Sequence, residues 1–282
     1  MKLRQVPAIN GVRWVRHGFA AFFQRPLAFA ALFTAFVFFG LFAALLPWIG
    51  PLLLLAVLPL VSLGFMLATG RVLQGRFPTL TVFAEPLRQS RHETLSILKL
   101  GLLYAATTVA VMLFSDLADG GKFEALQAAL GDNRAGGEAG RARIGELLAD
   151  PQLQFGLLLR LGLAALLSLP FWHAPALVHW SNQGVGQALF SSTVACWRNK
   201  GAFAVYGCAW GAVVFGFGFV ANLLAALLER PQLVAMAAVP AGLLFSTVFY
   251  ASLYATFADC FAPDDATAPP LPVPGEESAT KP

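Results

Sequence analysis

The chain has 282 residues, of which 57% are hydrophobic and 12% are charged, and its mean hydropathy is +0.68. Soluble proteins carry about 25% charged residues, and a soluble domain of this size could not bury so much apolar surface. The composition therefore excludes an ordinary soluble protein and predicts a bilayer protein. The net charge of +4 does not indicate nucleic-acid binding, because the basic residues cluster beside apolar segments, where anionic lipid headgroups lie.

Six segments are long and apolar enough to cross a bilayer, which takes about 20 helical residues for about 30 Å of hydrocarbon. In chain order they are approximately residues 27–46, 51–69, 97–115, 153–172, 202–228 and 233–258. We therefore predict an all-α polytopic integral membrane protein with a transmembrane domain over residues 1–262. A polar outer loop, 116–152, joins the third and fourth spans. The tail, 263–282, is rich in Pro, Ala, Asp and Glu, and we expect it to be disordered and cytoplasmic.

The segment before the first span has no separate apolar core with a cleavage site, so we expect no removed signal peptide. The three cysteines, Cys196, Cys208 and Cys260, have no paired spacing and are expected to be reduced. Orientation follows from the basic residues, which are commoner in the cytoplasmic loops of membrane proteins. With the N-terminus inside, 13 Lys and Arg lie inside and 5 lie outside, leaving Arg160 within the membrane. We predict that both termini are cytoplasmic.

A similar pattern precedes the first, third and fifth spans. Residues 10–25 form an amphipathic segment that Asn10 is expected to cap, and residues 87–93 and 189–200 also place apolar positions before basic ones. This pattern predicts three units, each an interfacial helix followed by a transmembrane hairpin, with the outer loop inserted in the second unit. The alternative is coincidence, since any six-helix protein contains three hairpins.

The outer loop contains two short amphipathic patterns separated by a glycine-rich stretch. Their apolar residues are Phe123, Leu126 and Leu130 in the first, and Ile144, Leu147 and Leu148 in the second. Two short helices are expected, acting as a lid or a partner contact, or simply as a connector on the headgroups. The few apolar anchors favour the connector.

The sequence contains no motif that carries known chemistry: His92-Glu93 lacks the second histidine of HExxH, and no GxSxG is present. Arg160 lies about two turns inside the fourth span, where an unpaired charge costs at least a few kcal/mol. Its candidate partners are Asp116, Asp150 and Glu229. A structural role at the interface is favoured over contact with a substrate.

Several ligand-type side chains from distant parts of the sequence share one predicted depth. These are His173, His179, Cys208, Asp259 and Cys260. Such residues can bind a transition metal or move a proton if they converge. The alternative is a set of separate polar residues near interfacial water, and it is favoured because the histidine spacing does not match one helix face. We therefore assign no catalytic, cofactor-binding or metal-binding residue and expect no cofactor.

Gly207 and Gly211 form a GxxxG pattern within the fifth span, which allows a second helix backbone to approach closely. Packing within the chain is the favoured use. A homo-oligomer or a membrane-protein partner is the alternative. Membrane lipids are the one partner that the composition implies directly.

Several short motifs resemble an uncharacterised family of multi-pass inner-membrane proteins from betaproteobacteria. They are Val6-Pro7-Ala8, Gly11, Trp14-Val15, Gly18-Phe19, Phe22-Phe23, Pro26, Ser62-Leu63-Gly64-Phe65-Met66 and Cys196-Trp197-Arg198-Asn199. The resemblance covers most of the chain except the outer loop and the tail. It implies a location in a bacterial inner membrane and carries no activity or site residue to this sequence.

Three functions remain open. The first is a non-catalytic envelope or accessory membrane protein, which the scarcity of polar groups in the spans favours. The second is a small-molecule or lipid transporter, because Pro59, Pro170 and Pro240 interrupt helices and interrupted helices expose backbone groups to substrates. The third is a membrane enzyme or metal-binding protein. A water-filled cavity at Arg160 or Asp259 would favour transport, and a converged histidine and carboxylate cluster would favour catalysis.

Overall fold

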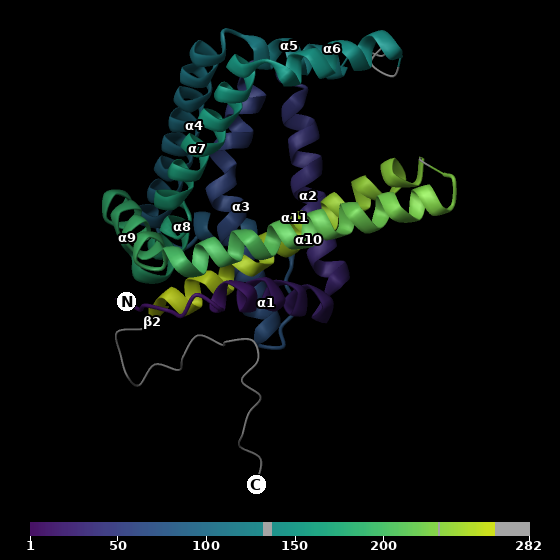
Figure 1. Ribbon diagram of the computed structural model, residues 1–282. Coiled ribbons are helices and arrows are strands. Elements are labelled where there is room, and N and C mark those ends of the chain that lie inside the picture. The colour runs from purple at the N-terminus through teal and green to yellow at the C-terminus, as the bar shows by residue number, and fades with distance from the viewer. Residues whose placement is uncertain (132–136, 231, 263–282) are drawn as a thin grey trace.

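The computed structural model describes residues 1–131, 137–230 and 232–262, and the predicted disordered tail therefore lies outside the described residues. The described chain is almost entirely helical (Figure 1). The helices are α1 (Asn10–Gln24), α2 (Pro26–Ala44), α3 (Ile49–Leu73), α4 (Arg91–Asp119), α5 (Lys122–Gly131), α6 (Glu138–Ala149), α7 (Pro151–Phe171), α8 (Ala174–Ser181), α9 (Val185–Arg198), α10 (Lys200–Leu227) and α11 (Gln232–Cys260). Two 3-10 turns, η1 (Leu80–Phe83) and η2 (Glu85–Leu87), lie between α3 and α4.

Six helices are long and apolar enough to cross a membrane, with mean hydropathies from 1.7 to 2.4. They are α2, α3, α4, α7 together with α8, α10 and α11. The protein is thus an all-α polytopic membrane protein. Pro59 and Pro240 lie inside the continuous helices α3 and α11, so the expectation that they interrupt helices is wrong. Pro170 lies in the last turn of α7, which ends at Phe171, and Pro175 lies in the first turn of α8. Proline is tolerated in a first turn but removes a hydrogen bond from a helix interior.

The helices form two groups with different directions (Figure 1). α3, α4 and α7 lie side by side in one layer, and α2 packs on α3. The hairpin of α10 and α11 runs obliquely across this layer, and α1 lies along both of its helices. Only 6% of the apolar window of α10 is buried, against 50% for α3. Most of α10 therefore presents its side chains to the surroundings, which suits lipid contact.

The core lies at the end of the molecule where the two ends of the described chain meet. There β1 (Lys2–Leu3) pairs antiparallel with β2 (Phe261–Ala262), in the register Lys2 with Ala262 and Leu3 with Phe261. We call this the β1–β2 end. The amphipathic helix α1 is buried here along one face, and its Gly11 lets the backbone of α10 approach, because an added Cβ would lie 2.3 Å from the Ala202 carbonyl oxygen.

Two short helices, α5 and α6, lie at the opposite end of the molecule (Figure 1). They fall in the outer loop, where the sequence predicts two short helices. Leu126 is buried, whereas Leu130 and Leu148 are exposed. The glycine-rich connection between these helices lies partly outside the described residues.

The three hairpins are preceded by different local structures. α1 precedes the first hairpin and α9 precedes the third, whereas only the turns η1 and η2 lie before α4. Residues 87–93 form no separate helix, because η2 ends at Leu87 and α4 already begins at Arg91, with the Ser90 hydroxyl accepting a hydrogen bond from the Glu93 amide. Pro86 and the extended backbone of Ser90 account for this break. The interfacial helix expected in the second unit is therefore absent from residues 87–93, which the structure describes.

Candidate functional site

The polar residues of the β1–β2 end link helices that are far apart in the sequence. Asp259 of α11 accepts a hydrogen bond from the indole nitrogen of Trp14 at 2.7 Å and one from the Asn10 amide at 2.9 Å. Trp14 is fully buried. The expected capping role of Asn10 is thus wrong, since its side chain makes no capping bond and is drawn to the carboxylate instead. Asp259 holds α1 on α11.

A second linkage gathers at Asn199, between α9 and α10. Its side-chain oxygen accepts a hydrogen bond from the Val6 amide at 2.9 Å, and its nitrogen donates to the Arg4 carbonyl at 3.0 Å and to the Cys260 sulfur at 3.5 Å. Asn199 is buried. One amide group therefore ties the N-terminal segment to the junction of α9 and α10 and to the end of α11.

Glu93 and His179 form a buried pair between α4 and α8. The Glu93 carboxylate lies 2.5 Å from the Nδ1 of His179, and the two side chains are only 6% and 5% exposed. The sequence analysis did not identify Glu93 as a partner of His179. The available signal was the Ser90-x-x-Glu93 pattern, which is typical of a helix start but does not indicate where the carboxylate points.

His173 occupies a different setting. It is fully buried among the rings of Phe203, Phe257 and Phe261, at centroid distances of 5.9, 5.9 and 5.4 Å. Neither ring nitrogen has a hydrogen-bond partner within the described residues. The expectation that His173 and His179 lie near interfacial water is therefore wrong for both side chains, because helix packing covers them.

The candidate residues do not form one site. His179 pairs with Glu93, Asp259 bonds to α1, His173 lies among phenylalanines, and Cys208 is exposed on α10. In the described part of the chain, no three His, Cys, Asp or Glu side chains are grouped so that they could hold a metal ion. A shared predicted depth was therefore not enough to bring these groups together, because each has different neighbours in the structure.

Arg160 is paired at the opposite end of the molecule. Its guanidinium lies 2.6 Å from Asp116 and 3.2 Å from the fully buried Asp119, and it stacks 3.8 Å from the centre of the Phe123 ring. Of the candidate partners, Asp116 is the correct one, and Asp119 was missed. Arg160 therefore joins α7 to α4 and α5, which supports the structural role expected for it.

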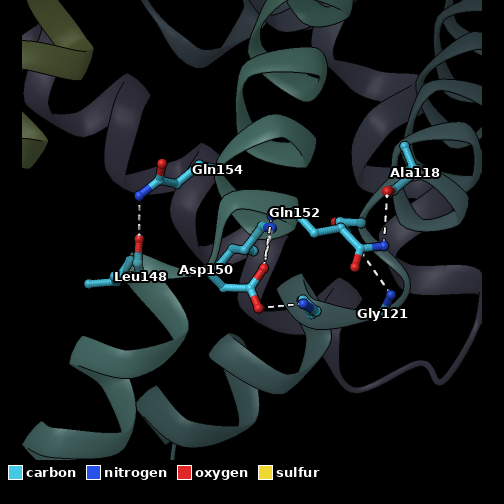
Figure 2. Close-up of polar contacts among 9 residues, drawn as sticks. Ala118, Gly121, Leu148, Asp150, Gln152 and Gln154 are labelled. Carbon is cyan, nitrogen blue, oxygen red and sulfur yellow. Dashed lines mark hydrogen bonds and ion pairs between the residues drawn. The ribbon is translucent and has the colours of Figure 1, made fainter.

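Asp150 contributes to the neighbouring corner between α6 and α7 (Figure 2). It accepts hydrogen bonds from the amides of Gln152 and Leu153 and pairs with Lys122 of α5. The hydrogen bond from Lys122 is the main cause that lowers the pKa of Asp150. Figure 2 also shows the side chain of Gln152 reaching the Ala118 carbonyl at the end of α4. Asp150 thus fixes the outer helices and is not the partner of Arg160.

The structure contains cavities between its long helices. One of about 150 Å³ lies among α3, α4, α7 and α11, another of about 170 Å³ lies beside α2 and α3, and a third of about 420 Å³ separates α10 from α11. Neither Arg160 nor Asp259 lines any of these three. The first is the most varied chemically, with aromatic, hydroxyl and aliphatic side chains in its wall.

Gly207 and Gly211 make no close helix contact. A Cβ added at Gly207 would meet nothing within 4 Å, and one at Gly211 would meet only Phe215 of the same helix. The favoured use of this pattern in packing within the chain is therefore wrong for the described residues. This small-residue face is left uncovered by the chain.

Comparison with known proteins gives one informative relative. A protein of Burkholderia thailandensis, named as a probable inner membrane protein, is 34% identical over 273 residues, which make up 96% of this chain and 98% of that protein. No family model matches the chain. No solved structure matches it significantly.

Proposed function

Because the chain belongs to the same family as the probable inner membrane protein of Burkholderia thailandensis, we propose that it spans a bacterial inner membrane with both termini in the cytoplasm. The membrane location is supported by the relative's name and by the six apolar helices. Because several motifs resemble a betaproteobacterial family, we also propose that the protein comes from that group of bacteria.

The proposed orientation places the β1–β2 end in the cytoplasm. α1 carries Arg13 and Arg16 at this end, α3 carries Arg71 in its last turn, and α9 carries Arg198 in its last turn. Cytoplasmic segments of membrane proteins are rich in Lys and Arg. The strand β1 pairs with β2, which follows α11, so both ends of the described chain lie at the same end of the molecule, as this orientation requires.

This orientation predicts which engineered cysteines react from outside the cell. In a chain whose three cysteines are replaced by alanine, cysteine at the exposed Ala142 of α6 should react in intact cells with a membrane-impermeant maleimide. Cysteine at the exposed Gln89 should react only after the cells are permeabilised. Equal expression of the two variants is the control. Labelling of Gln89→Cys in intact cells would reverse the orientation.

For activity, we propose a non-catalytic envelope or accessory protein of the inner membrane. The observation that carries this proposal is the use of the polar side chains at the β1–β2 end. Asp259, Asn199 and the pair of Glu93 with His179 each bond to another segment of the chain. Groups engaged in this way stabilise the fold and are not poised for chemistry. Membrane lipids, a membrane-protein partner or a second copy of the chain are the proposed partners, and nucleic acid is not.

A transport or lipid-handling role is the second candidate. It is favoured by the cavity beside Pro59, which lies inside the continuous helix α3, and by the hydroxyl side chains in the wall of this largely apolar space. An enzyme or a metal-binding protein is the third candidate. It ranks below the other two because the candidate ligands do not converge, namely His173, His179, Cys208 and Asp259.

Comparing membrane lipids and cytoplasmic metabolites in strains with and without the protein tests the proposed role. A non-catalytic accessory protein should leave both profiles unchanged, while its loss alters envelope integrity, measured as uptake of a normally excluded dye. The strain should be restored equally by the wild-type chain and by His173→Gln. Accumulation of one lipid or metabolite, reversed by the wild-type chain, would contradict the proposal and support transport or catalysis.

A further inference from the structure

The cavity among α3, α4, α7 and α11 has an unusual wall. Ten residues line it, and five of them are aromatic. The aromatic residues are Tyr104, Phe171, Trp172, Phe249 and Tyr250. Leu58, Ser168 and Phe249 are partly exposed, so the cavity reaches the surface that the bilayer surrounds. Its volume of about 150 Å³ matches that of an apolar cavity that takes up one benzene ring.

The aromatic side chains of this wall are held in place by neighbouring rings. Tyr104 meets Phe171 edge to face at a centroid distance of 5.1 Å, and Tyr250 stacks on Phe65 at 5.1 Å. Trp172 meets Phe249 edge to face at 6.1 Å. Such walls favour a flat ring as a guest, because offset stacking and edge-to-face contacts add to the burial of apolar area.

The hydrogen-bond donors of the wall differ in whether they are engaged. Ser62 donates to the Pro59 carbonyl at 2.8 Å, Ser168 donates to the Ala165 carbonyl at 2.7 Å, and the Trp172 indole donates to Thr256 at 3.1 Å. No hydrogen bond joins the hydroxyl of Tyr104 or Tyr250 to residues 1–131, 137–230 and 232–262, and neither hydroxyl is among the buried polar atoms without a partner, so both are open to a guest. Two donors without a protein partner in the wall of this cavity favour a guest that carries oxygen acceptors, because hydrogen bonds to such a guest add to the burial of its apolar surface.

We propose that this cavity binds the ring of a lipid-soluble quinone. A quinone combines a flat six-membered ring, which fits the volume and the aromatic wall, with carbonyl oxygens that can accept from Tyr104 and Tyr250. Its isoprenoid tail would leave through the partly exposed side into the bilayer. The proposal rests on the membrane location, and it goes beyond the accessory role because it names a ligand. It requires binding only and no electron transfer.

A lipid acyl chain is the main competitor for the same space. An acyl chain would fill an apolar groove but would leave both tyrosine hydroxyls without acceptors. Water could satisfy the hydroxyls but would gain few partners among the aromatic and aliphatic side chains. A quinone satisfies both the apolar and the polar part of the wall.

Binding can be measured on the full chain in lipid nanodiscs by titration with decylubiquinone, which quenches tryptophan fluorescence. Saturable quenching is expected, and Trp172→Phe should remove a large part of it. Tyr104→Phe and Tyr250→Phe should each weaken binding about five-fold, which corresponds to about 1 kcal/mol for a hydrogen bond. Ser168→Leu, which fills the cavity, should abolish binding.

Matched variants keep the test decisive. Tyr254→Phe is the control, because Tyr254 is buried on α11 outside this cavity, and it should bind as the wild type does. Each variant must remain monodisperse with an unchanged thermal transition. Decylcyclohexane, which lacks carbonyl oxygens, should not compete. Equal competition by decylcyclohexane, or full affinity in the Tyr104→Phe/Tyr250→Phe double variant, would show an unspecific apolar gap and overturn the proposal. A changed lipid profile in the deletion strain would contradict the accessory role without affecting this result.

Discussion

Replacing Gly101 with alanine should lower the thermal unfolding midpoint of the purified protein strongly. Gly101 lies on α4 where it crosses α3, and an added Cβ would lie 2.1 Å from the Ala56 carbonyl oxygen and 3.1 Å from its carbonyl carbon. These are backbone atoms, so the clash cannot be relieved by a rotamer change and the two helices must separate. Overpacking of this kind costs about 1–3 kcal/mol or more. Unfolding followed by tryptophan fluorescence in detergent would measure the change.

Gly162→Ala is the matched control for this experiment. Gly162 lies on α7, is exposed, and has nothing within 4 Å of an added Cβ. The thermal unfolding midpoint of Gly162→Ala should stay constant or rise slightly, because alanine is a better helix former than glycine by up to about 1 kcal/mol. Equal midpoints for Gly101→Ala and Gly162→Ala would show that α3 and α4 do not approach as closely as described.

Removing the carboxylate of Glu93 should destabilise the protein by about 3 kcal/mol. Glu93→Ala leaves the His179 ring buried without its partner, and the loss of one member of a buried pair typically costs 3–5 kcal/mol when the other keeps a charge and 1–3 kcal/mol when it does not. The same fluorescence-detected unfolding measures it. Glu124→Ala, at an exposed position on α5, is the control and should have almost no effect.

A double replacement separates the pair from its surroundings. Glu93→Leu combined with His179→Leu should recover part or all of the stability lost in Glu93→Ala, because apolar residues of similar size often replace a buried pair without loss. If the stability lost in the double variant equalled the sum of the losses in Glu93→Leu and His179→Leu, the two side chains would act independently. That result would contradict a direct interaction between α4 and α8.

The sequence alone was sufficient for the class of the protein and for its local elements. Six apolar segments need no tertiary information, because a helix that satisfies its own backbone bonds is the way for a single segment to cross lipid. The pairing of Arg160 with Asp116 could also be predicted from the sequence, since both residues lie near the outer ends of consecutive spans. Glycine between two amphipathic patterns was enough to predict two short outer helices.

Only the tertiary structure decided which polar groups meet. Glu93 and His179 are 86 positions apart, and Trp14 and Asp259 are 245 apart. Hydropathy places such residues at a depth along their helices, but rotation about the helix axis and the crossing of neighbouring helices decide what each side chain contacts. The oblique course of the α10 and α11 hairpin (Figure 1), the burial of His173 and the cavity lined by Tyr104 and Tyr250 all follow from that packing, which depends on side-chain shape and is not encoded in hydropathy.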